Sequence, residues 1–196
     1  HIDNIVIVPH EHNYMKTKDT FTKVFNSQPI KLGAGKEYWW GINTKYSSSL
    51  QFGSSFDNES VVVDLDKSKE LPWNIFGFSP YQWMRVDLSS IYSTSALTFK
   101  LKTTELPKLQ AILFAYTGKK RRLDKILNKS HFIDRGNGVY EAYLPLKSLM
   151  GYSEFRWDAL KEIRFKILEG TQCEIGDFQL IEFRGNPQKP TEWKGI

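Results

Sequence analysis

The segment Ser95-Ala-Leu-Thr-Phe-Lys-Leu-Lys-Thr103 decides the fold class of this 196-residue chain. Leu97, Phe99 and Leu101 alternate with polar residues, and a period of two places them on one face of an extended strand. Such a strand has one apolar face for a core and one polar face for solvent, as is common in antiparallel sheets. We therefore expect this segment to be a half-buried antiparallel strand.

The rest of the chain extends this pattern. In residues 160–168, every second position from Ile163 to Ile167 is apolar, and Asn137-Gly138 is a tight-turn signal at the start of another run. We count about ten to twelve short strands. Residues 121–128 differ, because apolar residues at helical spacing predict a single helical turn there. These patterns predict an all-β sandwich or barrel, with one domain over 1–184 and a linker or tail over 185–196.

Composition excludes several classes of protein. Hydrophobic residues make up 40% of the chain and charged residues 25%, as in folded proteins rather than disordered ones. The single cysteine, Cys173, excludes an internal disulfide, and we expect it to be a small buried apolar residue. No apolar run approaches the roughly 18 residues of a membrane span. The chain starts at His1 without a signal peptide, so we expect an excised or processed part of a larger protein.

The formal net charge of +5 favours an acidic partner. The sequence has no glycine-rich phosphate loop, zinc-finger spacing or RNP-like motif, so we expect no nucleic-acid binding. The densest basic cluster, Lys119-Lys-Arg-Arg122, is typical of a solvated loop. Its alternative role is contact with a sulfated or carboxylated polysaccharide.

The aromatic segment 73–83 gives the strongest indication of function, since five of its eleven residues are aromatic. If residues 79–88 form a strand, every second residue from Tyr81 to Asp87 lies on one face. Flat rings with a polar edge suit stacking on the C–H faces of sugar rings. We therefore predict a carbohydrate-binding surface here, and expect Phe76 and Phe78 to pack inside. The predicted stacking groups are Trp73, Tyr81 and Trp83, and the predicted polar contacts are Arg85 and Asp87.

Two further features bear on this surface. Trp39 and Trp40 point in opposite directions on a strand, so we expect one in the core and the other on the surface, where it joins the site. Basic residues that alternate with apolar ones would form one basic face beside the aromatic segment if their strands share a sheet. That face would suit an anionic glycan, and the alternative is that each residue only keeps its sheet soluble. These residues are Arg85, Lys100, Lys102, Arg164 and Lys166.

The order of segments in the second half resembles a known family. After the strand at 95–103 come Tyr140-Glu-Ala-Tyr-Leu-Pro-Leu-Lys-Ser-Leu149, Phe155-Arg-Trp-Asp-Ala-Leu-Lys-Glu-Ile-Arg-Phe165 and Cys173-Glu-Ile-Gly-Asp-Phe-Gln-Leu-Ile181. This succession resembles the galactose-binding-domain-like jelly rolls, especially the non-catalytic carbohydrate-binding modules attached to polysaccharide-degrading enzymes. The resemblance covers about residues 84–183, with Trp157 at the family's structural tryptophan position.

The resemblance implies a jelly-roll β-sandwich of two antiparallel sheets that binds a polysaccharide reversibly. It also implies a catalytic domain in the same parent polypeptide and a secreted or cell-surface location, and we expect a monomer. An aspartate in the closing strand often holds a structural calcium in this family, which implies Asp177 as a ligand. Because calcium takes roughly six to eight oxygen ligands, a surface or capping role is the alternative for Asp177. No other cofactor is expected.

Two other classes of function stay open. Some polysaccharide lyases and glycoside hydrolases are jelly rolls of similar size, and His131 and Tyr140 are available as lyase groups. The sequence has neither a Glu-x-Asp-x-x-Glu pattern for paired carboxylates nor a Ser-His-Asp elbow, so we expect no enzyme activity. The other alternative is a structural domain whose aromatic patch docks a partner protein.

Overall fold

Two antiparallel β-sheets account for most of the chain that the computed structural model describes, which comprises residues 30–32, 38–40, 50–56, 60–64, 75–80, 85–115, 122–151, 154–170 and 172–182. The seven-stranded sheet has the order β3 (Leu50–Phe52), β4 (Ser60–Asp64), β13 (Gln172–Glu182), β6 (Ser95–Lys102), β10 (Val139–Pro145) and β9 (Phe132–Gly136), and β1 (Ile30–Lys31) also pairs with β13. The six-stranded sheet has the order β11 (Met150–Gly151), β8 (Arg122–Leu127), β7 (Lys108–Ala115), β12 (Leu160–Glu169), β5 (Ile75–Phe78) and β2 (Trp39–Trp40).

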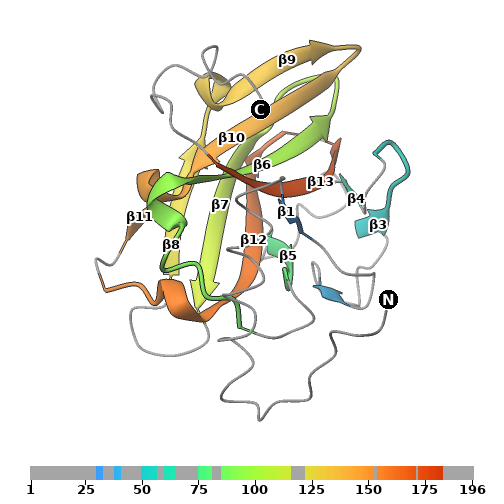
Figure 1. Cartoon of the computed structure of the whole chain (residues 1–196). Helices are drawn as coiled ribbons and strands as arrows, with labels where there is room; N and C mark the ends of the chain where they lie inside the picture. Colours follow the sequence, from blue (N-terminus) through green and yellow to red (C-terminus); the bar gives the residue numbers. More distant parts are fainter. Residues whose placement is uncertain are drawn as a thin grey trace, which may run out of the picture.

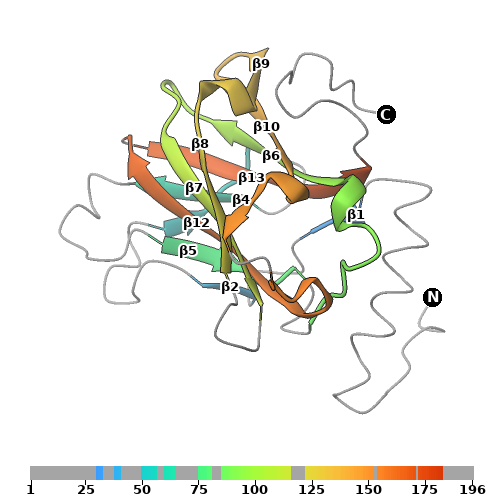
Figure 2. The ribbon, with the colours of Figure 1, turned by 90° about the vertical axis from the view of Figure 1, so that its left-hand side faces the viewer.

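The two sheets pack face to face as the layers of a jelly-roll β-sandwich (Figures 1 and 2). Only short 3-10 helices interrupt the strands of the described part: η4 (Tyr92–Thr94), η5 (Lys129–His131), η6 (Leu146–Ser148) and η7 (Trp157–Ala159). The all-β jelly-roll prediction is therefore confirmed. No helix in this part is both long enough and apolar enough to cross a membrane.

Alternation along the strands builds the core between the sheets. Phe99 of β6 and Phe178 of β13 face Phe165 of β12, and each of the three is at most 1% exposed. The Phe165 ring centroid lies 5.1 Å from that of Phe99 and 5.4 Å from that of Phe178. Burying such side chains is the main driving force for folding. The predicted inward faces of residues 95–103 and 160–168 are confirmed, as is the packing role of Phe76 and Phe78, both fully buried.

The helical turn expected at 121–128 is wrong, because this segment is the strand β8. Leu123 and Leu127 pair with β7 and are buried, whereas Ile126 is 49% exposed. Residues four apart lie on one face in a helix and also in a strand, so the spacing of the two leucines fits both structures. Pairing with a neighbouring strand decides between them.

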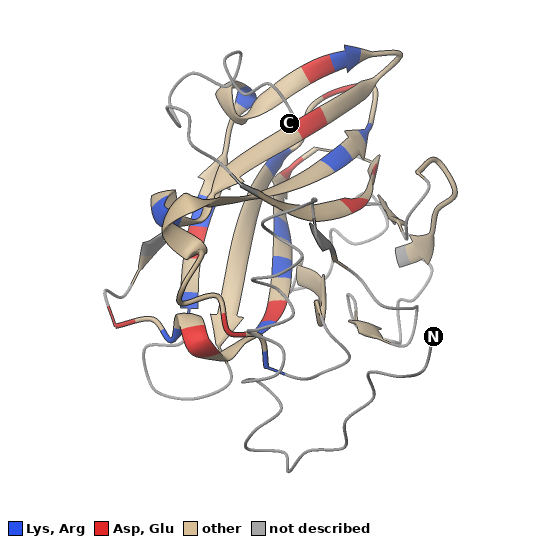
Figure 3. Cartoon of the chain, in the orientation of Figure 1, with Lys and Arg blue, Asp and Glu red and all other residues tan. Residues whose placement is uncertain are grey.

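The prediction of a single basic face is also wrong, because the strands that carry these basic residues belong to different sheets. Lys100 and Lys102 lie on β6 of the seven-stranded sheet, whereas Arg164 and Lys166 lie on β12 of the six-stranded sheet. Their outward directions are therefore opposite. Figure 3 accordingly shows Lys and Arg distributed over strands of both layers.

Cys173 and Trp157 both pack as the sequence predicts. Cys173 is 3% exposed, and burial raises the pKa of its thiol to about 12, which keeps it protonated and unreactive at neutral pH. Trp157 is half-buried against the core, stacked on Tyr92 with 4.6 Å between ring centroids. Its assignment to packing is confirmed.

Candidate functional site

A row of outward-facing residues crosses the six-stranded sheet. The strand register aligns one residue from each of five neighbouring strands, and four strand spacings give the row a length of about 19 Å. The row consists of Trp40 (β2), Gly77 (β5), Arg164 (β12), Ile112 (β7) and Asp124 (β8). All five lie on the side of the sheet opposite the core, where Trp40, Arg164 and Asp124 are half-buried while Gly77 and Ile112 are buried.

Two members of this row, Trp40 and Arg164, form a cluster with Phe114 and Glu162, which pair with each other in β7 and β12. We call these four residues the Trp40 platform. The Arg164 guanidinium carbon lies 5.1 Å from the centroid of the Trp40 ring and 3.7 Å from that of Phe114. Glu162 Oε2 accepts hydrogen bonds from Trp40 Nε1 at 3.0 Å and from Arg164 Nε at 2.9 Å. The ring contacts and the shared carboxylate fix the guanidinium between two aromatic rings.

The platform presents polar groups that can bind a ligand. No described residue accepts a hydrogen bond from the two terminal nitrogens of Arg164, whose side chain is 25% exposed. These nitrogens form a planar fork suited to paired oxygen atoms. Trp40 and Phe114 are both half-buried, so each ring keeps an exposed part. A ligand with a flat apolar face and oxygen-rich edges fits this combination.

Gly77 makes room for the platform. A Cβ atom at this position would lie 2.6 Å from Ile163 O and 3.1 Å from Arg164 Cγ, closer than side chains normally approach. We expect Gly77→Ala to lower the free energy of unfolding by about 1–3 kcal/mol, because β5 must shift away from β12. Urea denaturation measures this change. An unchanged stability would mean that β5 and β12 can move apart at this point without cost.

The two adjacent tryptophans face opposite sides of β2, as predicted. Trp39 is 9% exposed, and its ring centroid lies 4.6 Å from that of Phe78 and 5.6 Å from that of Phe178. It is a core residue, and its inclusion among the candidate ligand contacts is wrong. Trp40 is the outward member of the pair.

Asp87 does not lie on an exposed face, so this part of the prediction is wrong. Val86, Asp87 and Leu88 are all buried. Residues 85–88 do not form a regular strand with alternating faces, because their ladder pairing is limited to an isolated bridge between Val86 and Leu160. The Asp87 carboxylate accepts hydrogen bonds from Ser89 N at 2.9 Å and Ser89 Oγ at 2.6 Å, which closes a turn. Arg85 is half-buried, and its contact with a polysaccharide stays a prediction. Trp73, Tyr81 and Trp83 lie outside the described residues.

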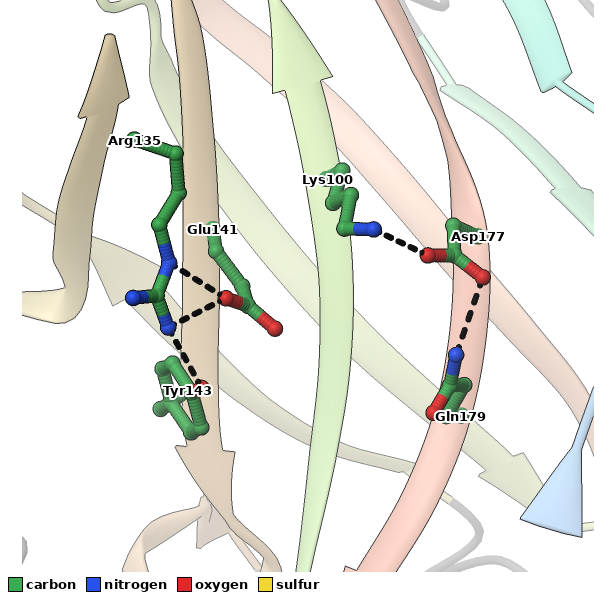
Figure 4. A network of polar contacts seen from close by, with 6 residues as sticks. All are labelled: Lys100, Arg135, Glu141, Tyr143, Asp177 and Gln179. Atoms are coloured by element: carbon green, nitrogen blue, oxygen red, sulfur yellow. Dashed lines mark hydrogen bonds and ion pairs between the residues drawn. The ribbon is translucent and has the colours of Figure 1, made fainter. Parts of the chain in front are cut away.

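Asp177 belongs to a network of polar contacts on the outer face of the seven-stranded sheet (Figure 4). Its Oδ2 lies 2.7 Å from Lys100 Nζ, and its Oδ1 accepts a hydrogen bond from Gln179. No group of three His, Cys, Asp or Glu side chains that could hold a metal ion occurs among the described residues. A single carboxylate already bound to a cation does not fit a calcium site. Asp177 instead joins β13 to β6.

The other half of this network is also satisfied internally. The Arg135 guanidinium donates hydrogen bonds to Glu141 Oε2 at 2.7 Å and to Tyr143 Oη at 3.1 Å. Tyr143 is only 2% exposed, and burial raises the pKa of its hydroxyl. We therefore place the candidate ligand surface on the six-stranded sheet, where the Arg164 fork has no described acceptor.

Phe114 and Glu162 are the platform residues that sequence reasoning missed. Phe114 lies in the apolar run 111–115, which shows no alternation of its own, yet Gln110 and Phe114 both face outward on β7. The polar residue Gln110 marks the outward parity of this strand and could have identified Phe114. Glu162 gives no comparable signal, because its pairing with Trp40 depends on the contact between distant strands.

No protein-family model and no curated protein sequence matches the chain. Among solved structures, a family 30 carbohydrate-binding module has a TM-score of 0.56 at 11% identity over 83% of this chain and 91% of that one. The family 30 module of a cellulosomal cellulase of Clostridium thermocellum has a TM-score of 0.51 at 14% identity, covering 81% and 95%. An agarase, AgWH50C, matches with a TM-score of 0.52 at 13% identity over 81% of this chain and 26% of the agarase. These comparisons show that the chain has the jelly-roll fold of these modules.

Proposed function

We propose that this chain is a non-catalytic carbohydrate-binding module that binds a polysaccharide on the Trp40 platform. The observation that carries the proposal is the Arg164 guanidinium held between Trp40 and Phe114 with its terminal nitrogens directed to no described acceptor. Aromatic rings contact the apolar faces of sugar rings, while the guanidinium and Glu162 bind their hydroxyl groups. The fold shared with family 30 carbohydrate-binding modules supports this assignment.

The preferred ligand is an anionic polysaccharide, such as a sulfated or uronate-rich one. Lys166 lies on the same face of β12 as Arg164, between Ile75 of β5 and Gln110 of β7. No described residue forms an ion pair or hydrogen bond with Lys166. Arg164 with Lys166 provides two cations against the one carboxylate of Glu162, so this part of the face attracts negative groups.

We further propose that the module targets an attached catalytic domain of the same polypeptide to its substrate, and that the parent enzyme is secreted or on the cell surface. The agarase match supports this arrangement, since about a quarter of that enzyme corresponds to this chain. Weak binding at a module raises the local concentration of an attached domain at the polysaccharide.

Affinity electrophoresis tests the proposal with gels that contain agarose, carrageenan, alginate or hydroxyethyl cellulose. We expect retardation in at least one anionic gel without release of reducing ends or unsaturated products. Trp40→Ala should weaken this retardation about two- to tenfold, because one stacking ring is lost. The unfolding temperature of the variant shows whether the fold is intact.

Phe52→Ala is the matched control, since Phe52 is 42% exposed but belongs to β3 of the other sheet. It should leave retardation unchanged. An equal loss in both variants would place the ligand elsewhere. Product release by the unmodified chain would favour the jelly-roll lyase or hydrolase, and retardation in no gel would favour the protein-interaction domain.

A further inference from the structure

The seven-stranded sheet carries a groove that the Trp40 platform does not use. Its volume is about 650 Å³, within the range of small-molecule sites, and it lies where β6 ends beside the turn between β9 and β10. We call it the hairpin groove. Its polar lining comes from Ser55, Lys102, Thr104, Asn137, Gln172 and Glu174, and Val62 contributes an apolar surface.

One wall of the hairpin groove is rigid. Glu174 is 8% exposed, and its Oε1 accepts hydrogen bonds from Ser55 N at 2.8 Å and Ser60 Oγ at 2.5 Å. Its Oε2 accepts a hydrogen bond from Ser55 Oγ at 2.5 Å, and Lys102 Nζ donates to the same hydroxyl at 3.2 Å. Because these bonds hold the wall before a ligand arrives, binding needs little reordering.

The opposite wall presents an exposed amide at a fixed turn. Asn137 has φ +53°, between Gly136 at +85° and Gly138 at +73°, so three consecutive residues adopt the left-handed conformation. Asn137, Thr104 and Gln172 are all exposed. Their amide and hydroxyl groups both donate and accept hydrogen bonds, as sugar hydroxyls require.

The charge balance of the groove favours a neutral ligand. Hydrogen bonds keep Glu174 ionised at neutral pH, and its charge offsets that of Lys102. No aromatic residue occurs among the described residues that line the groove, so hydrogen bonding rather than stacking would hold the ligand there. This chemistry differs from that of the Trp40 platform, which has two aromatic rings and two cations.

We propose that the hairpin groove is a second saccharide-binding site, which takes a short neutral stretch or the end of a glycan chain. The proposal rests on the proposed function for the class of ligand, but it concerns a different surface. The platform and the groove belong to different sheets of the sandwich, so one sugar residue cannot occupy both. Two weak sites on opposite layers let one module hold two chains, which raises its overall avidity.

Two-dimensional NMR of the full chain, titrated with neoagarotetraose and separately with cellotetraose, tests this site. We expect amide shifts of Lys102, Thr104, Asn137 and Gln172 to saturate with at least one sugar. The same shifts should persist in Trp40→Ala, whose platform is impaired. In the double variant Lys102→Met and Asn137→Gly, the affinity measured from these shifts should fall at least fivefold. The fold should be kept, because methionine retains the apolar stem of lysine and glycine tolerates the left-handed turn.

The control is Lys147→Met, which removes an exposed cation near the opposite end of β10 and should not change the titration. Platform shifts without any groove shifts would overturn the second site and leave the proposed function standing. Groove shifts that the double variant does not weaken would also overturn it. If neither surface responds to either sugar, the second site is rejected for neutral glycans, while the gels with anionic polysaccharides still decide the proposed function.

Discussion

Arg164→Ala is expected to lower the affinity for the retained polysaccharide by about 10- to 100-fold, the largest binding effect predicted for any single side chain of the platform. A hydrogen bond to a charged group contributes about 1.5–3 kcal/mol, and this guanidinium is already held in place by two rings and Glu162. The loss therefore includes both the contact and its preorganisation. Isothermal titration calorimetry with the polysaccharide that retards the chain measures it.

Matched variants separate the guanidinium from simple charge. Arg164→Lys keeps the charge but loses the planar fork and its contact with the rings, so we expect an intermediate affinity. Arg156→Ala removes an exposed arginine that pairs with Asp158 outside the platform and should bind as the unmodified chain does. If Arg164→Ala binds with the affinity of the unmodified chain, the Trp40 platform is not the polysaccharide-binding site.

Salt dependence tests the anionic nature of the ligand. Raising the ionic strength from about 0.1 M to about 1 M shortens the screening length from about 10 Å to about 3 Å. Binding that depends on Arg164 and Lys166 should then weaken severalfold, and Lys166→Met should reduce this salt dependence. Affinity that stays constant with salt would indicate a neutral ligand instead.

Much of the fold could be predicted from the sequence, because alternation reports which side of a strand faces the core. The inward residues of β6 and β12, such as Phe99 and Phe165, follow directly from it. Alternation does not report which sheet a strand joins. Lys100 and Arg164 therefore looked equivalent in sequence, although they lie on opposite outer faces.

The candidate site was only partly predictable, for the same physical reason. Alternation predicts that one of Trp39 and Trp40 faces outward, and it identifies which one as soon as the other is known to be buried. The contacts of Trp40 with Glu162 and Arg164 join residues 122 or more positions apart, and strand register alone creates them. The prediction that Asp87 is exposed was wrong because a side chain that closes a turn can be buried where regular alternation would expose it.

Glu174→Ala is expected to lower the free energy of unfolding at pH 7 by about 2–4 kcal/mol, the largest stability effect predicted here. The substitution leaves the buried donor Ser60 Oγ and the part-buried donor Ser55 N without their acceptor, and a buried donor without a partner is costly. It also removes the packing of the carboxylate against Gly53, which is so close that a Cβ atom on Gly53 could not fit. Urea denaturation measures the change, and Glu169→Ala, whose side chain is 71% exposed, should alter stability by only about 0–1 kcal/mol.

The pH dependence of this difference gives an independent check. Burial alone would raise the pKa of Glu174, but hydrogen bonds from Ser55 and Ser60 outweigh it and lower the pKa below its ordinary value of 4.5. A carboxyl group with a lowered pKa contributes its stability above the pKa of the unfolded chain and loses it as the pH falls through the pKa of the folded chain. The gap between the unmodified chain and Glu174→Ala should therefore be full at pH 7 and should narrow below pH 4.5. A gap that stays constant into the acid range would mean that the side chain stabilises the fold by packing rather than by its charge.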